Sequence, residues 1–498
     1  MADRIYDILV IGGGINGAMV ARDAAGRGLS VLLVEKDDLA SGTSSASSKL
    51  IHGGLRYLEH YDFSLVRESL REREILLRNA RHVIRPMRFI LPHVRGGRPV
   101  WLVRIGLWLY DHLSRNNSLP RCTVEDLTAG PYAQVLKPEI SRGFAYSDCW
   151  ADDARLVVLT ALGAARLGAE IMPRTRCISA HRDGRLWRAK LVRGDGSAFE
   201  IASRALVNAA GPWAREILTG VAGGATKAHL RLVKGSHIVV PRLHEGDHAF
   251  LLQNDDGRII FVIPYEGRYS LIGTTEIVHE GPPGPVGIDA REAVYLCDAV
   301  NRYFKAQIKP ADTVWSFAGL RPLLDDGHAD PASITRGYIL EIDRPVDRAP
   351  LISIFGGKLT TARQLAERVV DALDPPFRDL AEAWTGDGLL PGGEIADFDA
   401  FLERLKRDYS RFDADFISAL ARRHGTSARK ILGEAVSESD LGRHFGGGLY
   451  GAEVDWLIDE EWARETEDIL WRRTKCGLGV DAAGERALAR YMAKRKPR

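Results

Sequence analysis

Three cationic residues in this sequence stand next to glycines rather than on a polar helix face. They are Arg56, Arg321 and Lys358, and each follows a glycine by one or two positions. Binding a phosphate dianion usually takes two or more cations, with the fork of an arginine or the point charge of a lysine. We expect Arg56 and Arg321 to bind a phosphate group or the hydroxyls beside it. A surface position or an internal ion pair is the alternative for each arginine.

Two histidines are candidates for taking a proton from a substrate hydroxyl. Imidazole is the side chain best suited to that role near neutral pH. His52 stands between a serine-rich loop and a pair of glycines and is our first choice as the base. His237 is the second choice, and it is also a candidate for binding the substrate. A structural histidine with its hydrogen bonds satisfied is the alternative for both.

A glycine pattern near the N-terminus predicts a dinucleotide-binding unit. Gly12-Gly-Gly-Ile-Asn-Gly17 matches GxGxxG and lies between a continuous apolar strand and a helix of small residues over 18–28. A second apolar strand follows over 31–34. Continuous apolar strands suit a parallel sheet that is covered on both faces, so residues 5–36 are predicted to form a βαβ unit.

Each part of that unit has a role in binding a dinucleotide. Gly12 permits the tight turn, Gly14 lets a pyrophosphate approach the backbone, and Gly17 lets the helix and the strand pack closely. The helix N-terminus would present unpaired N–H groups to the phosphates. Glu35, at the end of the second strand, can hydrogen-bond the ribose hydroxyls.

Later glycine-rich runs distinguish FAD from NAD, which the fingerprint alone does not. They are the Ser/Gly/Thr-rich loop 41–49, which leads into 50–57, and the runs 208–213 and 355–361. A nicotinamide cofactor rarely needs glycine turns so far apart in the chain. A long FAD lying across the domain could use all of them, so the sequence predicts FAD.

With these segments, the chain resembles the respiratory, FAD-dependent glycerol-3-phosphate dehydrogenases. They belong to a wider family that includes the D-amino-acid and glycine oxidases. The motifs that carry the resemblance span essentially the whole chain: 44–59, 146–150, 234–241, 272–275, 319–322, 355–361 and 471–475. One departure is Ala210, where the related run often has threonine.

The resemblance implies an α/β fold with a discontinuous, Rossmann-type FAD-binding domain (1–83, 144–222 and 340–376). It also implies a β-rich substrate domain of the D-amino-acid oxidase type (84–143 and 223–339) and a C-terminal helical domain (388–498). The implied reaction is hydride transfer from sn-glycerol 3-phosphate to FAD, which gives dihydroxyacetone phosphate. Electrons then pass to ubiquinone in the membrane.

The fingerprint and the related motifs together give the residues that we expect to contact FAD. These are Gly12, Gly14, Ile15, Asn16, Gly17, Glu35, Lys36, Thr43, Ser44, Ser47, Ser48, Lys49, Cys177, Ala210, Gly211, Trp213, Gly356, Gly357, Lys358, Leu359 and Thr360.

Several of the site residues have more than one possible role. Lys358 is expected to open a helix, where it would either stabilise the reduced flavin or bind the substrate phosphate. Thr360 and Thr361 could cap that helix. His52 could bond the flavin ring instead of acting as the base. Tyr57 could bond the phosphate or pack in the core. The catalytic candidates are therefore His52, Arg56, Arg321 and Lys358, and the substrate-binding candidates are Arg56, Tyr57, Arg321, Lys358 and His237.

Composition narrows the class of protein. The chain has 498 residues, of which 45% are hydrophobic and 27% charged, so a disordered or fibrous protein is not expected. The five cysteines are scattered with no CxxC pair, and the histidines show no HxxxH spacing, so we expect neither disulfides nor a metal site. The N-terminus lacks the basic and apolar regions of an export signal, so a cytoplasmic location is expected.

A basic stretch followed by an apolar aromatic segment points to a membrane surface. Residues 67–104 contain ten arginines and three glutamates, and 99–110 are mostly apolar with two tryptophans. Such a pairing suits anionic lipid, which implies a peripheral protein on the inner face of the plasma membrane. A buried helix beside a solvated, charged one is the alternative. A homo-oligomer is also expected.

Three rival functions are open. One is an oxidase that passes electrons from the same substrate to oxygen. The second is an amino-acid oxidase, and the several cations argue against it. The third is a flavin protein that binds RNA through 67–104. The net charge of +2 and the lack of an RNA-binding motif argue against that function, so no nucleic acid is expected as a partner.

Overall fold

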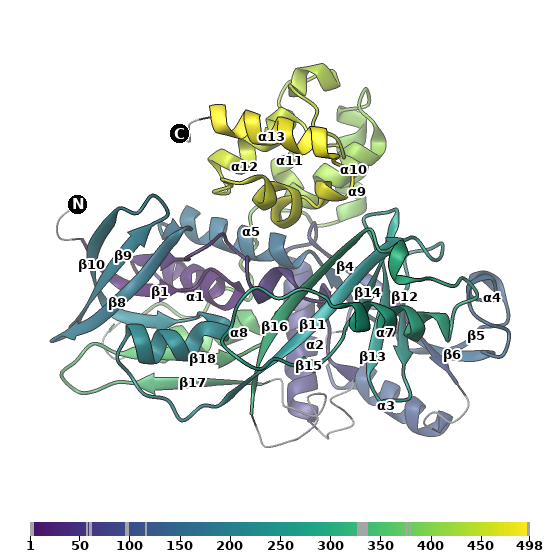
Figure 1. Ribbon diagram of the computed structural model, residues 1–498, viewed down its shortest axis with the longest axis horizontal. Helices are drawn as coiled ribbons and strands as arrows, with labels where there is room; N and C mark the ends of the chain where they lie inside the picture. The colour runs from purple at the N-terminus through teal and green to yellow at the C-terminus, as the bar shows by residue number, and fades with distance from the viewer. Residues whose placement is uncertain are drawn as a thin grey trace.

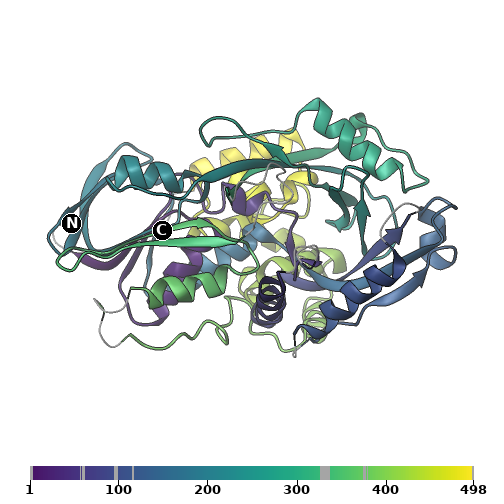
Figure 2. The same ribbon diagram turned by 90° about the horizontal axis from the view of Figure 1, so that it is seen from below.

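The computed structural model describes residues 4–55, 58, 62–94, 99–114, 117–325, 337–373, 377 and 380–495. Figure 1 shows two β-sheets side by side, with the C-terminal helices gathered above both. Seen from below in Figure 2, the same two sheets extend along the length of the molecule and the C-terminal helices lie behind them. Arg56 and Tyr57, two of the predicted site residues, lie outside the described residues.

The first sheet has eight strands, and its centre is parallel. The order along its main path is β17 (Tyr338–Asp343), β18 (Leu351–Gly356), β10 (Ala198–Asn208), β1 (Ile5–Ile11), β2 (Val31–Val34) and β7 (Glu170–Met172). The pairs from β18 to β7 are parallel, and β17 is antiparallel to β18. This is the sheet that the continuous apolar strands predict, since every residue of β2 is buried.

The two faces of this sheet are covered differently. The helices α1 (Ile15–Gly26), α5 (Asp153–Arg166) and α8 (Ala362–Asp371) share one apolar core with one face. On the other face lie β8 (Thr175–Asp183) and β9 (Leu186–Arg193), which form an antiparallel meander with β10. The predicted βαβ unit is present, and α1 begins at Ile15 rather than at residue 18.

The second sheet has ten strands and is mostly antiparallel. Its main path runs through β15 (Ile277–Val278), β11 (Leu230–Pro241), β14 (Tyr269–Gly273), β13 (Ile259–Tyr265), β12 (Ala249–Gln253), β4 (Ile84–His93), β6 (Arg142–Ala151) and β3 (Leu50–Ile51). Two further strands join it, β16 (Trp315–Leu324) beside β11 and β5 (Thr123–Asp126) beside β6. β3 and β6 come from ranges expected for the FAD-binding domain, so this sheet contains chain from both predicted domains.

Helices cover both faces of the second sheet. On one face α7 (Ala290–Asn301) and α4 (Gly130–Val135) pack into a core with β11, β12 and β13. On the other face lie α2 (Phe63–Asn79) and α3 (Val100–His112). α3 carries both tryptophans of the apolar segment 99–110.

The C-terminal region is helical, as predicted. It contains α9 (Phe398–Asp408), α10 (Ala414–His424), α11 (Ala428–Leu432), α12 (Gly451–Asp459) and α13 (Ala482–Lys494). These helices bury two apolar clusters of their own, so the region is a separate domain.

One predicted helix begins later than its sequence suggests. Lys358 is expected to open a helix, but α8 begins at Ala362 and residues 359–361 form a turn. Gly356 and Gly357 have φ angles of +81° and +101°, in a region that favours glycine, and this backbone is incompatible with a helix start. Thr361 occupies the N-cap position but makes no side-chain cap bond, so its predicted capping role is wrong.

Candidate functional site

The glycine turn after β1 has the geometry of a pyrophosphate cradle. A Cβ atom on Gly17 would lie 1.9 Å from the carbonyl oxygen of Gly12, and one on Gly12 would lie 2.5 Å from that of Ala209. Gly14 is the N-cap of α1 and carries no side chain to cap it. The Ile15 N–H instead donates to the hydroxyl of Ser44, at 3.0 Å. The helix N-terminus therefore has a polar lining suited to an anion.

Glu35 lies at the end of β2, beside this turn. Its carboxylate accepts hydrogen bonds from the backbone N–H groups of Gly13, at 2.7 Å, and Asp37, at 2.9 Å. Burial raises the pKa of Glu35, and the two backbone donors oppose that shift. The carboxylate has further lone pairs for bonds from ribose hydroxyls, and that role of Glu35 stays a prediction.

The Ser/Gly/Thr-rich loop is anchored on both sides. The Thr43 hydroxyl donates to the carbonyl of Leu320 on β16. Ser47 donates to the Asp153 carboxylate at the start of α5, with Oγ at 2.7 Å. Lys49 is fully buried and pairs with the same carboxylate at 2.7 Å. The ammonium of Lys49 also donates to the Ser45 carbonyl, so one of its three donors bonds the loop itself and another bonds α5.

Ser48 joins the loop to the second sheet. Its hydroxyl lies 2.9 Å from Nε2 of His237 on β11, and the His237 ring stacks on Phe317 of β16 at a centroid distance of 4.8 Å. Burial, aided by the positive charges of Arg321 and Lys49, lowers the pKa of His237 well below its usual value. The imidazole is therefore neutral at physiological pH.

Two buried polar atoms at this site have no hydrogen-bond partner within the described part of the chain. They are Nδ1 of His237 and Oδ1 of Asn16, the latter in the first turn of α1. Asn16 also donates to the Gly356 carbonyl at 3.3 Å. Leaving such atoms unpaired costs about 1–3 kcal/mol each. A polar cofactor ring between α1, β11 and β18 would supply partners, so the residues are suited to a flavin.

The turn that carries Lys358 meets the other predicted segments. The His52 N–H donates weakly to the Thr360 hydroxyl, at 3.4 Å. A Cβ atom on Gly356 would lie 3.6 Å from the carbonyl oxygen of Pro322, which directly follows Arg321. Leu359 follows on the same turn. The structure thus brings together the segments of His52, Arg321 and Lys358, which are far apart in sequence.

Arg321 is held in place by neighbours on the second sheet. Its Nη2 donates to Thr274 at 2.7 Å, and its Nη1 forms an ion pair with Glu276 at 3.2 Å. Gly235 on β11 makes room for the guanidinium, because a Cβ atom there would lie 2.4 Å from Nη2. The internal ion pair that was the alternative for this arginine is therefore present, and the side chain is still partly exposed.

The remaining predicted FAD contacts lie near the end of β2 and in the run 208–213. The Lys36 ammonium lies 4.8 Å from the centroid of the Trp213 ring, and Trp213 donates to the carbonyl of Pro283 at 3.1 Å. Ala210 and Gly211 form the turn after β10. The thiol of Cys177 is buried in the core on β8, 3.6 Å from the Ser179 carbonyl, which leaves its backbone for any contact with FAD.

Sequence reasoning missed a buried network that holds the backbone beside His52. The Gly53 N–H donates to the Tyr110 hydroxyl at 2.9 Å, and that hydroxyl donates to Asp148 at 2.8 Å. Arg73 pairs with Asp148 at 2.9 Å. Burial raises the pKa of Asp148, and Arg73 opposes that shift. The only sequence signal was the motif 146–150, in which Asp148 had no assigned role.

The parallel sheet, its glycine turn and Glu35 define a dinucleotide-binding protein of the Rossmann type. Residues 7–363 match the profile described as FAD dependent oxidoreductase, and residues 383–495 match the C-terminal domain of alpha-glycerophosphate oxidase. The chain belongs to the FAD-dependent oxidoreductase family, and its cofactor is FAD. The predicted fold class and cofactor are confirmed.

Individual relatives cover nearly the whole chain. A glycerol-3-phosphate dehydrogenase of Pseudomonas aeruginosa is 50% identical over 495 residues, which cover 99% of this chain and 96% of that protein. A D-erythritol 1-phosphate dehydrogenase of Brucella abortus is 49% identical over 488 residues, 97% of each chain. The crystal structure of a glycerol-3-phosphate dehydrogenase from Bacillus halodurans, complexed with FAD, is 29% identical with a TM-score of 0.72, covering 95% of this chain and 86% of that one.

Proposed function

We propose that this enzyme oxidises sn-glycerol 3-phosphate to dihydroxyacetone phosphate and passes the electrons to ubiquinone. When bound, FAD supplies the acceptor for the hydride. The observation that carries the proposal is that Gly356, two residues before Lys358, lies close to Pro322, which directly follows Arg321: a Cβ atom on Gly356 would lie 3.6 Å from the Pro322 carbonyl oxygen. Two such cations suit a phosphate dianion. The Pseudomonas aeruginosa relative, which bears the same activity in its name, supports the choice of substrate.

The chain's own residues prepare this site before the substrate arrives. Thr274 and Glu276 hold the Arg321 guanidinium, which limits the reorganisation needed to bind a phosphate. The Tyr110–Asp148 network fixes the backbone next to His52. A histidine held in this way can accept the proton of the substrate hydroxyl.

The test is anaerobic mixing of the purified, FAD-loaded protein with glycerol 3-phosphate. We expect the flavin absorbance to bleach on mixing. One dihydroxyacetone phosphate should form for each flavin that is reduced. Bleaching by glycine but not by glycerol 3-phosphate would overturn the proposal.

A second substrate is supported by the relative from Brucella abortus. That protein is named for D-erythritol 1-phosphate, which is one carbon longer, and its identity to this chain is nearly as high. Both substrates present a hydroxyl near a phosphate, so the same cations would serve them. The ratio of kcat/KM for the two compounds decides between them, and a higher value for D-erythritol 1-phosphate would establish the second candidate.

The electron acceptor needs a separate test, because oxygen is the alternative to ubiquinone. We expect turnover with a soluble quinone analogue to exceed peroxide release in air-saturated buffer. Peroxide release at the same rate without quinone would show that the enzyme is an oxidase.

The pH dependence of the reaction should identify the base. An acid limb of log kcat/KM is expected because the histidine that accepts the proton must be neutral to do so. The pKa of His237 is too low to produce that limb, because burial and nearby cations keep the ring neutral. We therefore expect the limb to disappear in His52→Gln and to persist in His237→Gln. The opposite pattern would make His237 the base.

The apolar segment after the basic stretch forms an exposed face. On α3, the side chains of Trp101, Leu102, Ile105 and Trp108 are 63%, 42%, 49% and 60% exposed, whereas Leu107 and Tyr110 on the opposite face are buried. No helix among the described residues is long and apolar enough to cross a membrane. In Figure 1, α3 lies on the side of the molecule away from the C-terminal helices. We propose that α3 lies in the surface of an anionic membrane on its cytoplasmic face.

The arginines of 67–104 give little support to binding RNA. Arg73 is buried against Asp148. Arg85 lies over the Trp150 ring at 4.7 Å, and Arg88 donates to the carbonyls of Pro120 and Arg121. These three side chains are directed into the protein, so the ten arginines do not form one continuous solvent-facing stripe, although Arg67, Arg71, Arg78 and Arg104 are exposed.

Replacing both tryptophans of the α3 face with glutamate should abolish binding to vesicles. Trp101→Glu/Trp108→Glu exchanges two large apolar groups for charges that anionic lipid repels. Sedimentation with vesicles containing phosphatidylglycerol would measure the loss, and we expect dye-linked activity in solution to be retained. Val436→Glu, at an exposed position of the C-terminal domain, is the matched control. Equal sedimentation of both variants would contradict the proposed membrane face.

A further inference from the structure

One short segment of the C-terminal domain contacts three separate parts of the cofactor region. This segment, 471–475, is one of the motifs that carry the family resemblance, and the proposed reaction gives it no role. Trp471 stacks on Trp315 of β16, with ring centroids 4.3 Å apart. Arg472 and Arg473 bond Asp38 in the turn after β2, and Lys475 pairs with Asp152 at the N-cap of α5, at 3.1 Å.

The contact with Asp38 is the most fully buried of the three. The Asp38 carboxylate is 2% exposed and accepts bonds from Nη2 of Arg473, at 2.8 Å, and Nε of Arg472, at 2.6 Å. The second Nη of Arg473 also bonds this carboxylate, which makes a bidentate pair. Arg473 is itself fully buried. Removing one partner of such a pair leaves a buried charge without compensation.

The turn that contains Asp38 forms one side of the glycine turn. The Glu35 carboxylate accepts from the Gly13 N–H at 2.7 Å, and the Ala40 N–H donates to the Gly13 carbonyl at 3.1 Å. Asp38 lies between these two contacts, and its own carbonyl accepts from Ser41. The arginines of the C-terminal domain therefore hold the middle of the turn that positions Gly13 and Glu35.

Lys475 supports the neighbouring loop in the same way. Burial would raise the pKa of Asp152, but Lys475 and Lys49 outweigh it and hold the pKa below its usual value. Asp152 caps α5 through the Arg155 N–H, and the next residue, Asp153, holds Ser47 and Lys49. The ion pair thus stabilises the helix end to which the Ser/Gly/Thr-rich loop is attached.

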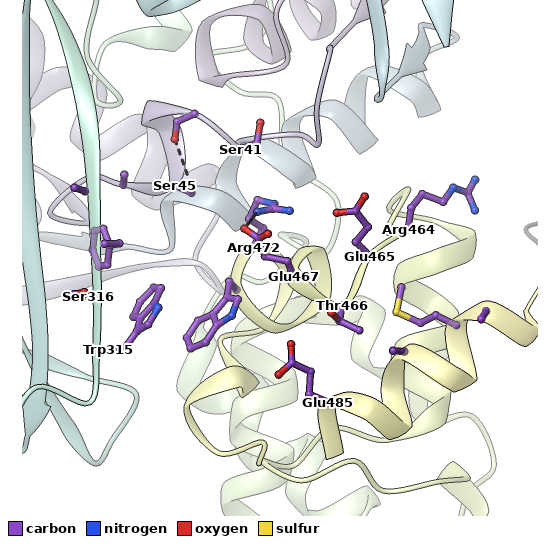
Figure 3. A pocket seen from close by; sticks show the side chains of 18 residues that line it. Ser41, Ser45, Trp315, Ser316, Arg464, Glu465, Thr466, Glu467, Arg472 and Glu485 are labelled. Carbon is purple, nitrogen blue, oxygen red and sulfur yellow. Dashed lines mark hydrogen bonds and ion pairs between the residues drawn. The ribbon is translucent and has the colours of Figure 1, made fainter. Parts of the chain in front are cut away.

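A cavity lies beside the segment 471–475, so the contacts of this segment with the cofactor region are confined to a small area. It has a volume of about 890 Å³ and separates the loop 41–46 from the C-terminal helices beside the segment 471–475. Figure 3 shows the side chains around it, with Ser41, Ser45, Trp315 and Ser316 toward the two sheets and Arg464, Glu465 and Glu485 on the C-terminal domain. Because this part of the domain interface is not filled, the C-terminal domain contacts the turn through the ion pairs of Asp38. Within its own domain the turn is also held by the buried side chain of Leu39 and by the Arg174 N–H, which donates to the Asp37 carbonyl at 2.7 Å.

We propose that Arg472 and Arg473 are positioning residues for FAD. They act through Asp38, which sets the turn 35–41 and with it the Gly13 backbone and the Glu35 carboxylate. The C-terminal helical domain is therefore part of the cofactor site although it lies outside the Rossmann sheet. This inference rests on the proposed placement of FAD at the glycine turn.

The experiment measures FAD binding to apoprotein by quenching of flavin fluorescence, together with the unfolding temperature of each apoprotein. Arg473→Lys keeps the charge and loses the bidentate fork. Its matched control is Arg155→Lys, because Arg155 is equally buried and joins α5 to Glu461 of the C-terminal domain at 3.1 Å without touching the turn. A third variant, Glu35→Gln, tests whether FAD lies at the glycine turn.

We expect Arg473→Lys to bind FAD at least about tenfold more weakly than the wild type, and Arg155→Lys to bind it within about twofold. The unfolding temperatures of the two apoproteins should fall by similar amounts. Equal FAD affinity in the two lysine variants would overturn the positioning role. Unchanged affinity in Glu35→Gln would instead overturn the placement of FAD. If Arg473→Lys does not fold, Arg472→Lys is judged by the same criterion, since Arg472 bonds the same carboxylate.

Discussion

Replacing Gly17 with valine should give a protein that retains almost no FAD. A Cβ atom at this position would lie 1.9 Å from the Gly12 carbonyl oxygen, and that oxygen belongs to the backbone of the glycine turn. The clash can be relieved only by moving α1 away from β1. Such a shift would take the helix N-terminus from the pyrophosphate and would disturb the Asn16 contact with Gly356. We expect FAD binding to weaken by at least about a hundredfold.

The flavin-to-protein ratio of the purified variant measures this effect, and circular dichroism checks that the fold is kept. Gly106→Val is the control. Gly106 is also a helical glycine, on α3, but a Cβ atom there would meet nothing within 4 Å. A Gly17→Val protein with a full complement of FAD would show that α1 can move without loss of the site.

Much of the first sheet follows from local sequence. The βαβ unit was predictable because its strands are uniformly apolar, its glycines are spaced for a turn, and its helix begins where they end. The position of Lys358 was predicted less well. Its segment has the composition of a helix start, but the positive φ angles of Gly356 and Gly357 delay α8 to Ala362.

Contacts between distant segments could not be read from the sequence. Tyr110, Asp148 and Arg73 meet Gly53 only because α2, α3 and β6 pack together, and no spacing in the chain signals this. The role of α3 was ambiguous for a related reason. A uniformly apolar helix is equally consistent with a buried and an interfacial position, and the exposure of Trp101 and Trp108 distinguishes the two.

The hydrogen bonds around Asp38 are another case of this kind. The motif 471–475 carries part of the family resemblance, but Asp38, the partner of Arg472 and Arg473, lies more than four hundred positions away in the chain. Its function as a contact to the cofactor turn became visible only when the two domains were placed together. Long, specific motifs without an evident chemical role are therefore candidates for holding one domain against another.

Replacing Lys358 with methionine should lower kcat/KM for glycerol 3-phosphate by about a hundredfold, since removing one member of a desolvated, hydrogen-bonded charge pair costs about 3 kcal/mol. The two possible roles of Lys358 predict different accompanying changes. If Lys358 binds the phosphate, its loss raises KM for glycerol 3-phosphate and leaves any slow oxidation of unphosphorylated glycerol unchanged. If Lys358 stabilises the reduced flavin, its loss lowers the reduction potential of the flavin and slows both substrates equally. Steady-state kinetics with both alcohols and a redox titration distinguish the two roles.

Lys358→Arg keeps the charge and should recover part of the activity. Lys190→Met, at an exposed position on β9, is the matched control. Wild-type kinetics in Lys358→Met would remove this lysine from the site altogether.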